Sequence, residues 1–372
     1  MKFNQHNQQL RIIIAGGGTG GHIFPAIAVA QAIQVIQPDA AILFVGATGK
    51  MEMEKVPQAG YEIKGLTIAG LNRSNMFKNL SLPFKLIKSF FQVRSIFNAF
   101  KPNAVFGVGG YSSFPVLKFA QSKGIPTFIH ESNAFAGKSN IWLGKNATKI
   151  FTGTQGMEQF FPSDKIVVTG NPVRKNISAS VYSKDAALMK FGLLPERKTV
   201  LIVGGSLGAN SINDAIMQHL ESFSNHSIQL IWQTGKSFAA QADEITANPK
   251  YNSIKVQTFI TRMDLAYAAA DLIISRAGAS SISELCIVGK PAILVPSPNV
   301  AEDHQTKNAM ALVNDGAALL IKDAEADSKL IDSALALLKD STQQAELSAR
   351  IQQSALPNAA NIIAEQVFSI CK

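Results

Sequence analysis

The chain contains the same local pattern twice: a short apolar strand, a glycine-rich turn and a helix. Residues 11–22, Arg-Ile-Ile-Ile-Ala followed by Gly-Gly-Gly-Thr-Gly-Gly-His, lead into a helical run over 23–36. Residues 199–208, Thr-Val-Leu-Ile-Val followed by Gly-Gly-Ser-Leu-Gly, lead into a run over 209–220. A strand that passes through a glycine turn into a helix is the usual opening of a doubly wound α/β domain. The repeat therefore predicts two such domains in tandem, each built on a mainly parallel sheet.

Short apolar blocks elsewhere support this α/β fold class, because parallel strands covered by helices on both faces show no alternation. We expect them at 41–45, 104–108, 127–130, 149–151 and 166–169, and then at 229–233, 254–257, 272–275 and 292–295. Gly and Pro punctuate the chain at 170–172. We therefore expect a first domain over 1–171, a second over 172–354, and a C-terminal segment over 355–372. The helix of that segment, at about 359–371, could pack back on the first domain.

Cysteine content and hydropathy bear on the compartment. The two cysteines, Cys286 and Cys371, are 85 positions apart with no second pair, which favours a reducing cytoplasm over a disulfide framework. Residues 12–38 carry no charge, but glycines and three glutamines interrupt them, so we expect no transmembrane segment. The first ten residues do not have the pattern of an export signal.

The positive charge belongs to the first half of the chain. Residues 1–172 hold 17 Lys and Arg against 7 Asp and Glu, a net charge of +10, whereas residues 173–372 hold 18 against 19. Between Glu62 and Glu131 nine basic residues and no acidic residue occur. Such a surface attracts anions, and the candidates are nucleic acid, anionic lipid and a phosphorylated substrate.

Residues 83–100 predict an amphipathic helix with a second apolar face. One face is ordinary core and consists of Leu86, Phe90, Val93, Phe97 and Phe100. The second face holds Phe84, Ile87 and Phe91, with Lys88 and Arg94 beside it. Apolar residues ringed by cations suit the headgroup zone of an anionic membrane, unless a loop or helix covers them. Nucleic acid is not expected, because the stripe is rich in Phe and no nucleic-acid module is recognisable.

The first glycine turn could hold an anionic group at the amino end of the following helix. A nicotinamide cofactor is not expected, because strand 41–45 ends in Gly-Ala-Thr and Asp39 precedes it instead of following it. His22 lies at the end of this turn. A structural role and a catalytic role for His22 both remain open.

The second half offers a metal-free diphosphate site. Residues 275–285 follow an apolar strand, and their small side chains open a helix whose dipole can face a diphosphate. Glu284, one to two turns into that helix, could accept both hydroxyls of a ribose or simply face solvent. The turn 204–208 adds a hydroxyl, or is a plain tight turn. No Asp-x-Asp pair occurs in the sequence, so we expect neither a metal nor another cofactor.

Taken together, the motifs resemble those of the bacterial MurG family, the N-acetylglucosaminyltransferases that form lipid II in peptidoglycan synthesis. The resemblance runs from about Arg11 to Ala311, and the combination is far more specific than any single motif. The segments that carry it are Gly17–His22, Gly109–Tyr111, His130–Asn133, Gly170–Arg174, Gly204–Ala209 and Arg276–Glu284. Ser132 and Leu207 depart from the family, where Gln is frequent at both positions.

The resemblance implies the GT-B fold, in which two Rossmann-like domains face a cleft. The first domain would bind the acceptor and associate with the membrane, and the second would bind UDP-N-acetylglucosamine. The implied donor-contacting residues are Thr19, Gly20, Gly21, Asn133, Arg174, Ser206, Ile260, Ala279, Ser280, Ser281, Ile282, Ser283, Glu284 and Gln305. The implied acceptor is undecaprenyl-pyrophosphoryl-MurNAc-pentapeptide (lipid I), at the cytoplasmic face of the cell membrane. Contacts with other cell-wall synthesis proteins are left open.

The implied reaction is an inverting displacement by the 4-hydroxyl of the muramoyl sugar on the anomeric carbon of the donor sugar. His22 or Glu131 would accept the hydroxyl proton, since both lie in first-domain loops. Two other hypotheses stand beside this one. A glycolipid glycosyltransferase or a UDP-N-acetylglucosamine 2-epimerase would share the Glu284 helix, and a non-catalytic sensor would bind the sugar nucleotide without turnover.

Overall fold

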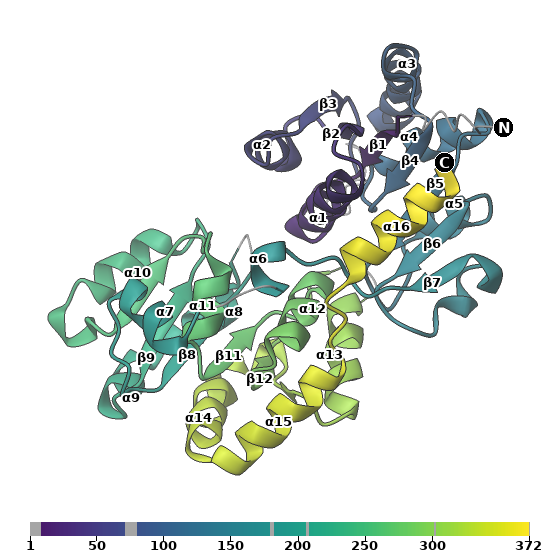
Figure 1. Cartoon of the computed structure of the whole chain (residues 1–372). Coiled ribbons are helices and arrows are strands. Elements are labelled where there is room, and N and C mark those ends of the chain that lie inside the picture. The colour runs from purple at the N-terminus through teal and green to yellow at the C-terminus, as the bar shows by residue number, and fades with distance from the viewer. Residues whose placement is uncertain (1–8, 71–79, 179–181, 206–207, 301–302, 372) are drawn as a thin grey trace. The chain divides into compact units, whose positions relative to one another are not determined.

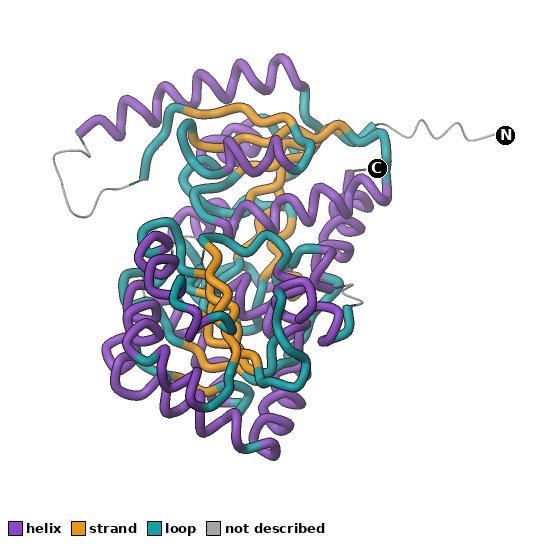
Figure 2. The backbone as a smooth tube through the Cα atoms, turned by 90° about the vertical axis from the view of Figure 1, so that its left-hand side faces the viewer, coloured by secondary structure: helices purple, strands orange, loops and turns teal. Residues whose placement is uncertain are grey.

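The computed structural model describes residues 9–70, 80–178, 182–205, 208–300 and 303–371 (Figure 1). The chain separates into two compact units. Unit 1 comprises residues 1–174 and 358–372, and unit 2 comprises residues 175–357. Figure 2 shows helices around the strands in each unit.

Unit 1 is built on a seven-stranded parallel sheet with the order β3-β2-β1-β4-β5-β6-β7. The strands are β1 Arg11–Ala15, β2 Ala41–Ala47, β3 Glu62–Leu66, β4 Ala104–Gly107, β5 Thr127–Glu131, β6 Lys149–Thr152 and β7 Ile166–Val168. Strand β3 was not predicted, because Glu62 and Lys64 interrupt its apolar character at the sheet edge.

Helices cover both faces of this sheet. They are α1 Gly20–Ile36, α2 Glu52–Gln58, α3 Leu82–Phe100, α4 Ser113–Ser122, α5 Lys138–Gly144 and α16 Ala359–Cys371, with 3-10 helices η2 Met157–Gln159 and η3 Ser163–Lys165. Alternation along β1 separates two cores. Ile12 and Ile14 belong to a core with residues of α1 and α16, whereas Ile13 and Ala15 pack with residues of α3, α4 and α5. The continuous apolar run of β1 is therefore buried on both sides.

The last helix of the chain belongs to unit 1. Helix α16 lies beside α1, as the yellow and purple helices of Figure 1 show. Its residues Ile363, Ala364 and Val367 are fully buried in the same core as Ile23 and Val29 of α1. The chain thus leaves unit 1 after Arg174 and returns to it at Asn358.

Unit 2 repeats the arrangement with a six-stranded parallel sheet, in the order β10-β9-β8-β11-β12-β13. The strands are β8 Thr199–Val203, β9 Gln229–Gln233, β10 Ile254–Gln257, β11 Leu272–Ser275, β12 Ala292–Leu294 and β13 Leu319–Leu320. Strand β13 is too short to give a sequence pattern. The predicted α/β fold with two doubly wound parallel sheets is confirmed.

Helices also cover both faces of the second sheet. They are α6 Lys175–Ser178, α7 Lys184–Phe191, α8 Asn210–Gln218, α9 Leu220–Asn225, α10 Ala239–Thr246, α11 Met263–Ala269, α12 Ala279–Val288, α13 His304–Asn314, α14 Ala326–Lys339 and α15 Ser341–Gln353, with 3-10 helices η4 Pro249–Tyr251 and η6 Asp323–Glu325. Val200 and Ile202 of β8 face one core, and Leu201 and Val203 face the other.

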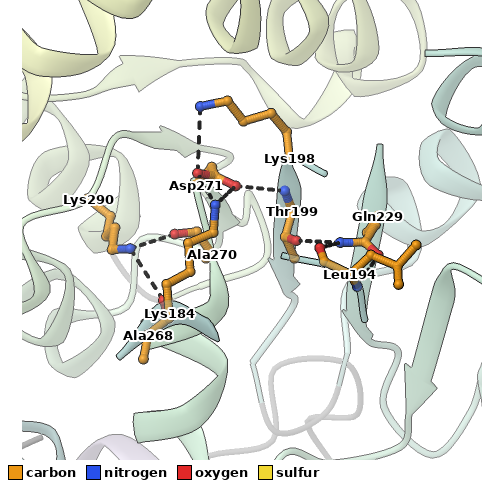
Figure 3. Close-up of polar contacts among 9 residues, drawn as sticks. All are labelled: Lys184, Leu194, Lys198, Thr199, Gln229, Ala268, Ala270, Asp271 and Lys290. Atoms are coloured by element: carbon orange, nitrogen blue, oxygen red, sulfur yellow. Dashed lines mark hydrogen bonds and ion pairs between the residues drawn. The ribbon is translucent and has the colours of Figure 1, made fainter. Parts of the chain in front are cut away.

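A cluster of polar side chains forms hydrogen bonds at the amino ends of the strands of this sheet (Figure 3). Asp271, just before β11, accepts hydrogen bonds from Lys184 Nζ at 2.7 and 2.8 Å and from the Thr199 N–H at 2.8 Å. Lys290 donates to the Ala270 carbonyl at 2.6 Å, and burial lowers the pKa of this amine. These bonds join α7, β8 and β11 at the edge opposite the carboxyl ends of the strands.

The packing of α16 predicts the effect of two neighbouring substitutions. Ile363→Ala removes a side chain that is 0% exposed, so we expect unit 1 to lose about 2–5 kcal/mol of unfolding free energy. Ile362→Ala changes a side chain that is 37% exposed, so the loss should stay below about 1 kcal/mol. Urea unfolding of both variants measures the difference. Equal losses would show that α16 does not complete the core of unit 1.

Candidate functional site

The first candidate site is in unit 1, where the strand order reverses between β1 and β4. Doubly wound sheets bind ligands at the carboxyl ends of the strands at this point. The turns after the two strands touch: a Cβ on Gly16 would lie 2.6 Å from the Gly109 carbonyl oxygen, and one on Gly110 would lie 2.5 Å from the Gly17 carbonyl oxygen. Only glycine allows backbones to approach this closely. The two glycine motifs therefore form one surface.

Glu52 lies beneath the first glycine turn. Its carboxylate is 1% exposed and accepts the Gly18 N–H at 2.8 Å and the Ala47 N–H at 2.9 Å. A Cβ on Gly17 would lie 2.4 Å from Glu52 Oε1. The sequence did not single out Glu52, because it lies in an ordinary helix, five residues beyond the end of β2. The contacts show that it holds the turn after β1 against the end of β2.

His22 lies in the first turn of α1, half-buried beside Gly109. Its Nδ1 is 3.1 Å from the Gly17 carbonyl oxygen. Because a carbonyl oxygen only accepts, this contact favours the neutral tautomer with the proton on Nδ1 and the lone pair on Nε2. A Cβ on Gly109 would lie 3.0 Å from Nε2. The glycine after β4 thus leaves space around the basic nitrogen.

A second histidine lies near His22. His130, in β5, is fully buried, and this burial lowers its pKa to about 4. Its Nε2 lies 3.4 Å from the Gly170 carbonyl oxygen, a contact that opposes the shift, whereas the proximity of His22 adds to it. At neutral pH His130 is therefore uncharged.

Glu131 ends β5 and organises the loop that follows it. Its carboxylate is 4% exposed and accepts hydrogen bonds from the Asn133 N–H at 3.1 Å, the Gly137 N–H at 3.0 Å and Asn140 Nδ2 at 2.9 Å. Asn133 Nδ2 lies 3.4 Å from the same carboxylate. Asn133, which is predicted to contact the sugar donor, is therefore held in place by Glu131, the carboxylate predicted as an alternative base.

The other residues of unit 1 that are predicted to contact the sugar donor lie at the start of α1. Thr19 is the N-cap residue of this helix, and Gly20 and Gly21 form its first turn. The guanidinium of Arg174 lies 5.2 Å from the ring centroid of Phe24 in the next turn. The structure therefore brings these four predicted residues to one end of α1, together with His22.

The second site lies at the corresponding reversal in unit 2, between β8 and β11. Gly208 has φ +84°, and a Cβ on it would lie 2.2 Å from the Thr234 carbonyl oxygen, so this turn also requires glycine. Ser206 lies outside the described residues. Ile260, after β10, is buried, and its N–H donates to Gln233 Oε1 at 2.8 Å. The Ile260 loop and the glycine turn are thus neighbours at the carboxyl edge.

Arg276 joins three segments at this edge: the loop after β12, the start of α8 and the 3-10 helix η6. Its guanidinium donates to the Val295 carbonyl at 3.0 Å, to the Pro296 carbonyl at 3.2 Å and to Ser211 Oγ at 3.0 Å. It also forms an ion pair with Asp323. The sequence showed Arg276 only as part of a motif, because its partners come from distant elements.

Helix α12 carries six of the nine donor-contacting residues predicted in unit 2. It begins after the N-cap residue Gly278, so Ala279, Ser280, Ser281, Ile282 and Ser283 form its first turns. Glu284 is 8% exposed, and the Tyr267 hydroxyl donates to its Oε2 at 2.9 Å. Gln305, in α13, accepts the Ser297 N–H at 2.9 Å and so braces the loop after β12. The amino end of α12, with its positive dipole, lies directly after β11.

The second apolar face of α3 is exposed. Phe84, Ile87 and Phe91 are 76%, 57% and 69% exposed, and Leu80, just before the helix, is 73% exposed. Spacings of four, three and four residues place these side chains on one stripe. Lys88 and Arg94 are also exposed. Among the described helices, none has both the length and the apolar character needed to cross a membrane.

Comparison with known proteins identifies the class first. Residues 12–152 match the model of the glycosyltransferase family 28 N-terminal domain, and residues 199–363 match that of its C-terminal domain. The two matches correspond to the two sheets. The fold is thus that of a two-domain glycosyltransferase.

Curated relatives give the particular family. The chain is 52% identical to the UDP-N-acetylglucosamine--N-acetylmuramyl-(pentapeptide) pyrophosphoryl-undecaprenol N-acetylglucosamine transferase of Bacteroides thetaiotaomicron, over 98% of this chain and 99% of that protein. It is 49% identical to the protein of the same name from Porphyromonas gingivalis, over 100% of this chain and 98% of that protein. The chain belongs to this family of transferases, the MurG family.

Solved structures agree with this assignment. The crystal structure of Acinetobacter baumannii MurG matches with a TM-score of 0.73 and 27% identity, over 96% of this chain and 99% of that chain. The UDP-GlcNAc 2-epimerase of Neisseria meningitidis bound to UDP-GlcNAc matches with a TM-score of 0.64 and 15% identity, over 96% and 100%. The second likeness concerns the fold alone. The predicted GT-B fold is confirmed.

The buried His130 predicts how stability depends on pH. Its folded pKa of about 4 lies below the value of 6.5 expected when unfolded, so the unfolded state binds the proton more tightly. The stability that the neutral His130 contributes is therefore fully present above about pH 6.5 and is lost as the pH falls toward 4. When the pH falls from 7.5 to 5.0, we expect His130 to lower the free energy of unfolding by about 2 kcal/mol. Urea unfolding at both pH values measures this loss, and His130→Gln should remove that part of it. A variant with an unchanged pH dependence would contradict the assignment to His130.

Proposed function

We propose that this protein transfers N-acetylglucosamine from UDP-N-acetylglucosamine to the 4-hydroxyl of the muramoyl sugar in lipid I, during peptidoglycan synthesis. The observation that carries the proposal is identity of about half the residues, over nearly the full length, to transferases named for this activity. The two glycine-lined sites at the sheet reversals support it. We assign unit 1 to the acceptor and unit 2 to the donor.

In the proposed reaction, the acceptor 4-hydroxyl attacks the anomeric carbon from the face opposite UDP. The new C–O bond forms as the bond to the UDP oxygen breaks, so the configuration at that carbon inverts. The hydroxyl proton goes to His22 Nε2, because the contact of Nδ1 with the Gly17 carbonyl leaves the lone pair on Nε2. UDP departs with the electron pair of the broken bond.

Glu131 has a different role in this proposal. Its carboxylate already accepts hydrogen bonds from three residues of the following loop. A carboxylate so fully engaged is a poor acceptor for a substrate proton. We therefore assign Glu131 to positioning Asn133, and His22 to the base.

The leaving group would be stabilised in unit 2. The positive end of the α12 dipole, together with Ser206, would offset the charge that grows on the diphosphate. Glu284 would bind the ribose hydroxyls with one oxygen oriented by Tyr267. Because these groups supply the positive potential, the proposal requires no metal.

We further propose that unit 1 binds the cytoplasmic face of the cell membrane. The exposed stripe of Leu80, Phe84, Ile87 and Phe91 supports this, together with Lys88 and Arg94. Aromatic and aliphatic side chains would enter the headgroup zone, and the cations would pair with anionic lipid phosphates. This arrangement would bring the lipid-linked acceptor to the domain assigned to it.

The transfer reaction provides the first test. Wild-type protein should move radiolabelled N-acetylglucosamine from its UDP donor to a short-chain lipid I analogue in the presence of EDTA. His22→Ala should lower kcat about 100-fold or more and leave UDP binding intact, since a general base contributes about 10²–10⁴-fold. His226→Ala, at an exposed histidine of unit 2, is the matched control. UDP release without labelled lipid, or an epimerised sugar, would overturn the assignment. Full activity of His22→Ala would show that a group other than His22 is the general base.

Vesicle binding tests the membrane proposal. The double variant Phe84→Ser with Phe91→Ser should bind vesicles containing phosphatidylglycerol about tenfold more weakly or worse, because each buried apolar side chain contributes about 1.5–3 kcal/mol. Val35→Ser is the control, since Val35 is 74% exposed in the same unit but lies outside the stripe. Turnover of a short-chain, soluble acceptor should not change. Equal binding by the double variant and the control would contradict a membrane role for the stripe.

A further inference from the structure

Strand β9 begins and ends with a buried glutamine. Gln229 is 1% exposed and Gln233 is 3% exposed. Each side chain forms hydrogen bonds with a backbone segment outside its own strand. The two residues have the same type, strand and burial, but they act at opposite edges of the sheet. This difference allows one to be tested against the other.

Gln233 connects two loops at the carboxyl edge. Its Nε2 donates to the Gly205 carbonyl at 2.9 Å, and its Oε1 accepts the Ile260 N–H at 2.8 Å. Strand β9 lies between β8 and β10 in the sheet, so its last side chain can reach the turn after one neighbour and the loop after the other. Both ends of the amide are therefore in use.

Among unbranched side chains of this length, the amide is the one that can both donate and accept as these contacts require. The Gly205 carbonyl requires a donor and the Ile260 N–H requires an acceptor. A carboxylate could only accept, and an apolar side chain could do neither. A buried backbone group that loses its partner costs about 1–3 kcal/mol, so each loop would shift to find another partner. The spacing between the two loops thus depends on Gln233.

We propose that Gln233 is a positioning residue for the sugar-nucleotide donor. The resemblance places donor contacts at Ser206, directly after Gly205, and at Ile260 itself. Gln233 holds Gly205 and Ile260 relative to each other without touching the reacting atoms. The inference rests on the proposed function of unit 2 as the donor domain. It predicts that the loss of Gln233 weakens donor binding and leaves the acceptor unaffected.

Gln229 supplies the matched control. Its Nε2 donates to the Leu194 carbonyl at 2.8 Å, and its Oε1 accepts the Leu194 N–H at 2.7 Å (Figure 3). It lies beside Thr199 at the amino edge, at the opposite end of the strand from Gln233. Substitution of Gln229 therefore removes at least as many hydrogen bonds from unit 2 as substitution of Gln233.

The experiment compares Gln233→Met with Gln229→Met in the full-length protein. Methionine keeps the length and the apolar stem, so both variants should retain the fold. We expect Gln233→Met to raise the KM for UDP-N-acetylglucosamine and the Kd for UDP about tenfold, with little change in the KM for a short-chain lipid I analogue. Gln229→Met should leave all three constants within about twofold of wild type, although its urea midpoint falls by as much or more. Gln233→Glu, which keeps the acceptor oxygen, should also weaken UDP binding.

Several outcomes would overturn the inference. Equal weakening of UDP binding in both methionine variants would show a general loss of stability in unit 2. Unchanged UDP binding in Gln233→Met and Gln233→Glu would show that the donor does not depend on this amide. If the wild-type protein itself bound no UDP, the proposed function would fail, and the inference with it. Wild-type binding and transfer without a Gln233 effect would overturn the inference alone.

Discussion

Parallel strands place all of their carboxyl ends on one edge of a sheet, and both proposed substrate sites depend on this constraint. At the reversal of strand order, the connections from neighbouring strands diverge and leave backbone groups accessible. In unit 1 the turns at Gly16 and Gly110 are so close that a side chain on either would meet the other turn. Close approach of this kind brings His22 to the edge, where the proposed chemistry takes place.

Buried polar side chains hold these turns in place. Glu52, Glu131 and Gln233 each bond to backbone groups of loops at the carboxyl edges, and Arg276 bonds to carbonyls after β12. A buried polar group that is fully paired is specific for one arrangement, because any other arrangement leaves a donor or acceptor unsatisfied. The loops are therefore fixed by hydrogen bonds from inside the protein before a substrate binds.

Much of this architecture could be predicted from the sequence, because apolar blocks and glycine turns are local signals. Most strands of both sheets and the second apolar face of α3 follow from such patterns, whereas the strand order and the exposure of that face do not. Strands β3 and β13 do not follow from them, because β3 carries charged residues and β13 is only two residues long. The supporting roles of Glu52, Gln233 and Arg276 could not be predicted either. Hydrogen-bond partners lie up to 34 positions away for Glu52, 28 for Gln233 and 65 for Arg276, and nothing in the local sequence marks them.

The return of the chain to unit 1 affects how the protein is made. The core beneath α1 includes Ile363, Ala364 and Val367, which follow all of unit 2 in the chain and are synthesised after it. Until unit 2 has been synthesised, unit 1 lacks these residues and part of its apolar surface stays uncovered. Unit 2, whose residues are contiguous, can fold while the chain is still growing. Unit 1 is thus completed only after unit 2 has been synthesised.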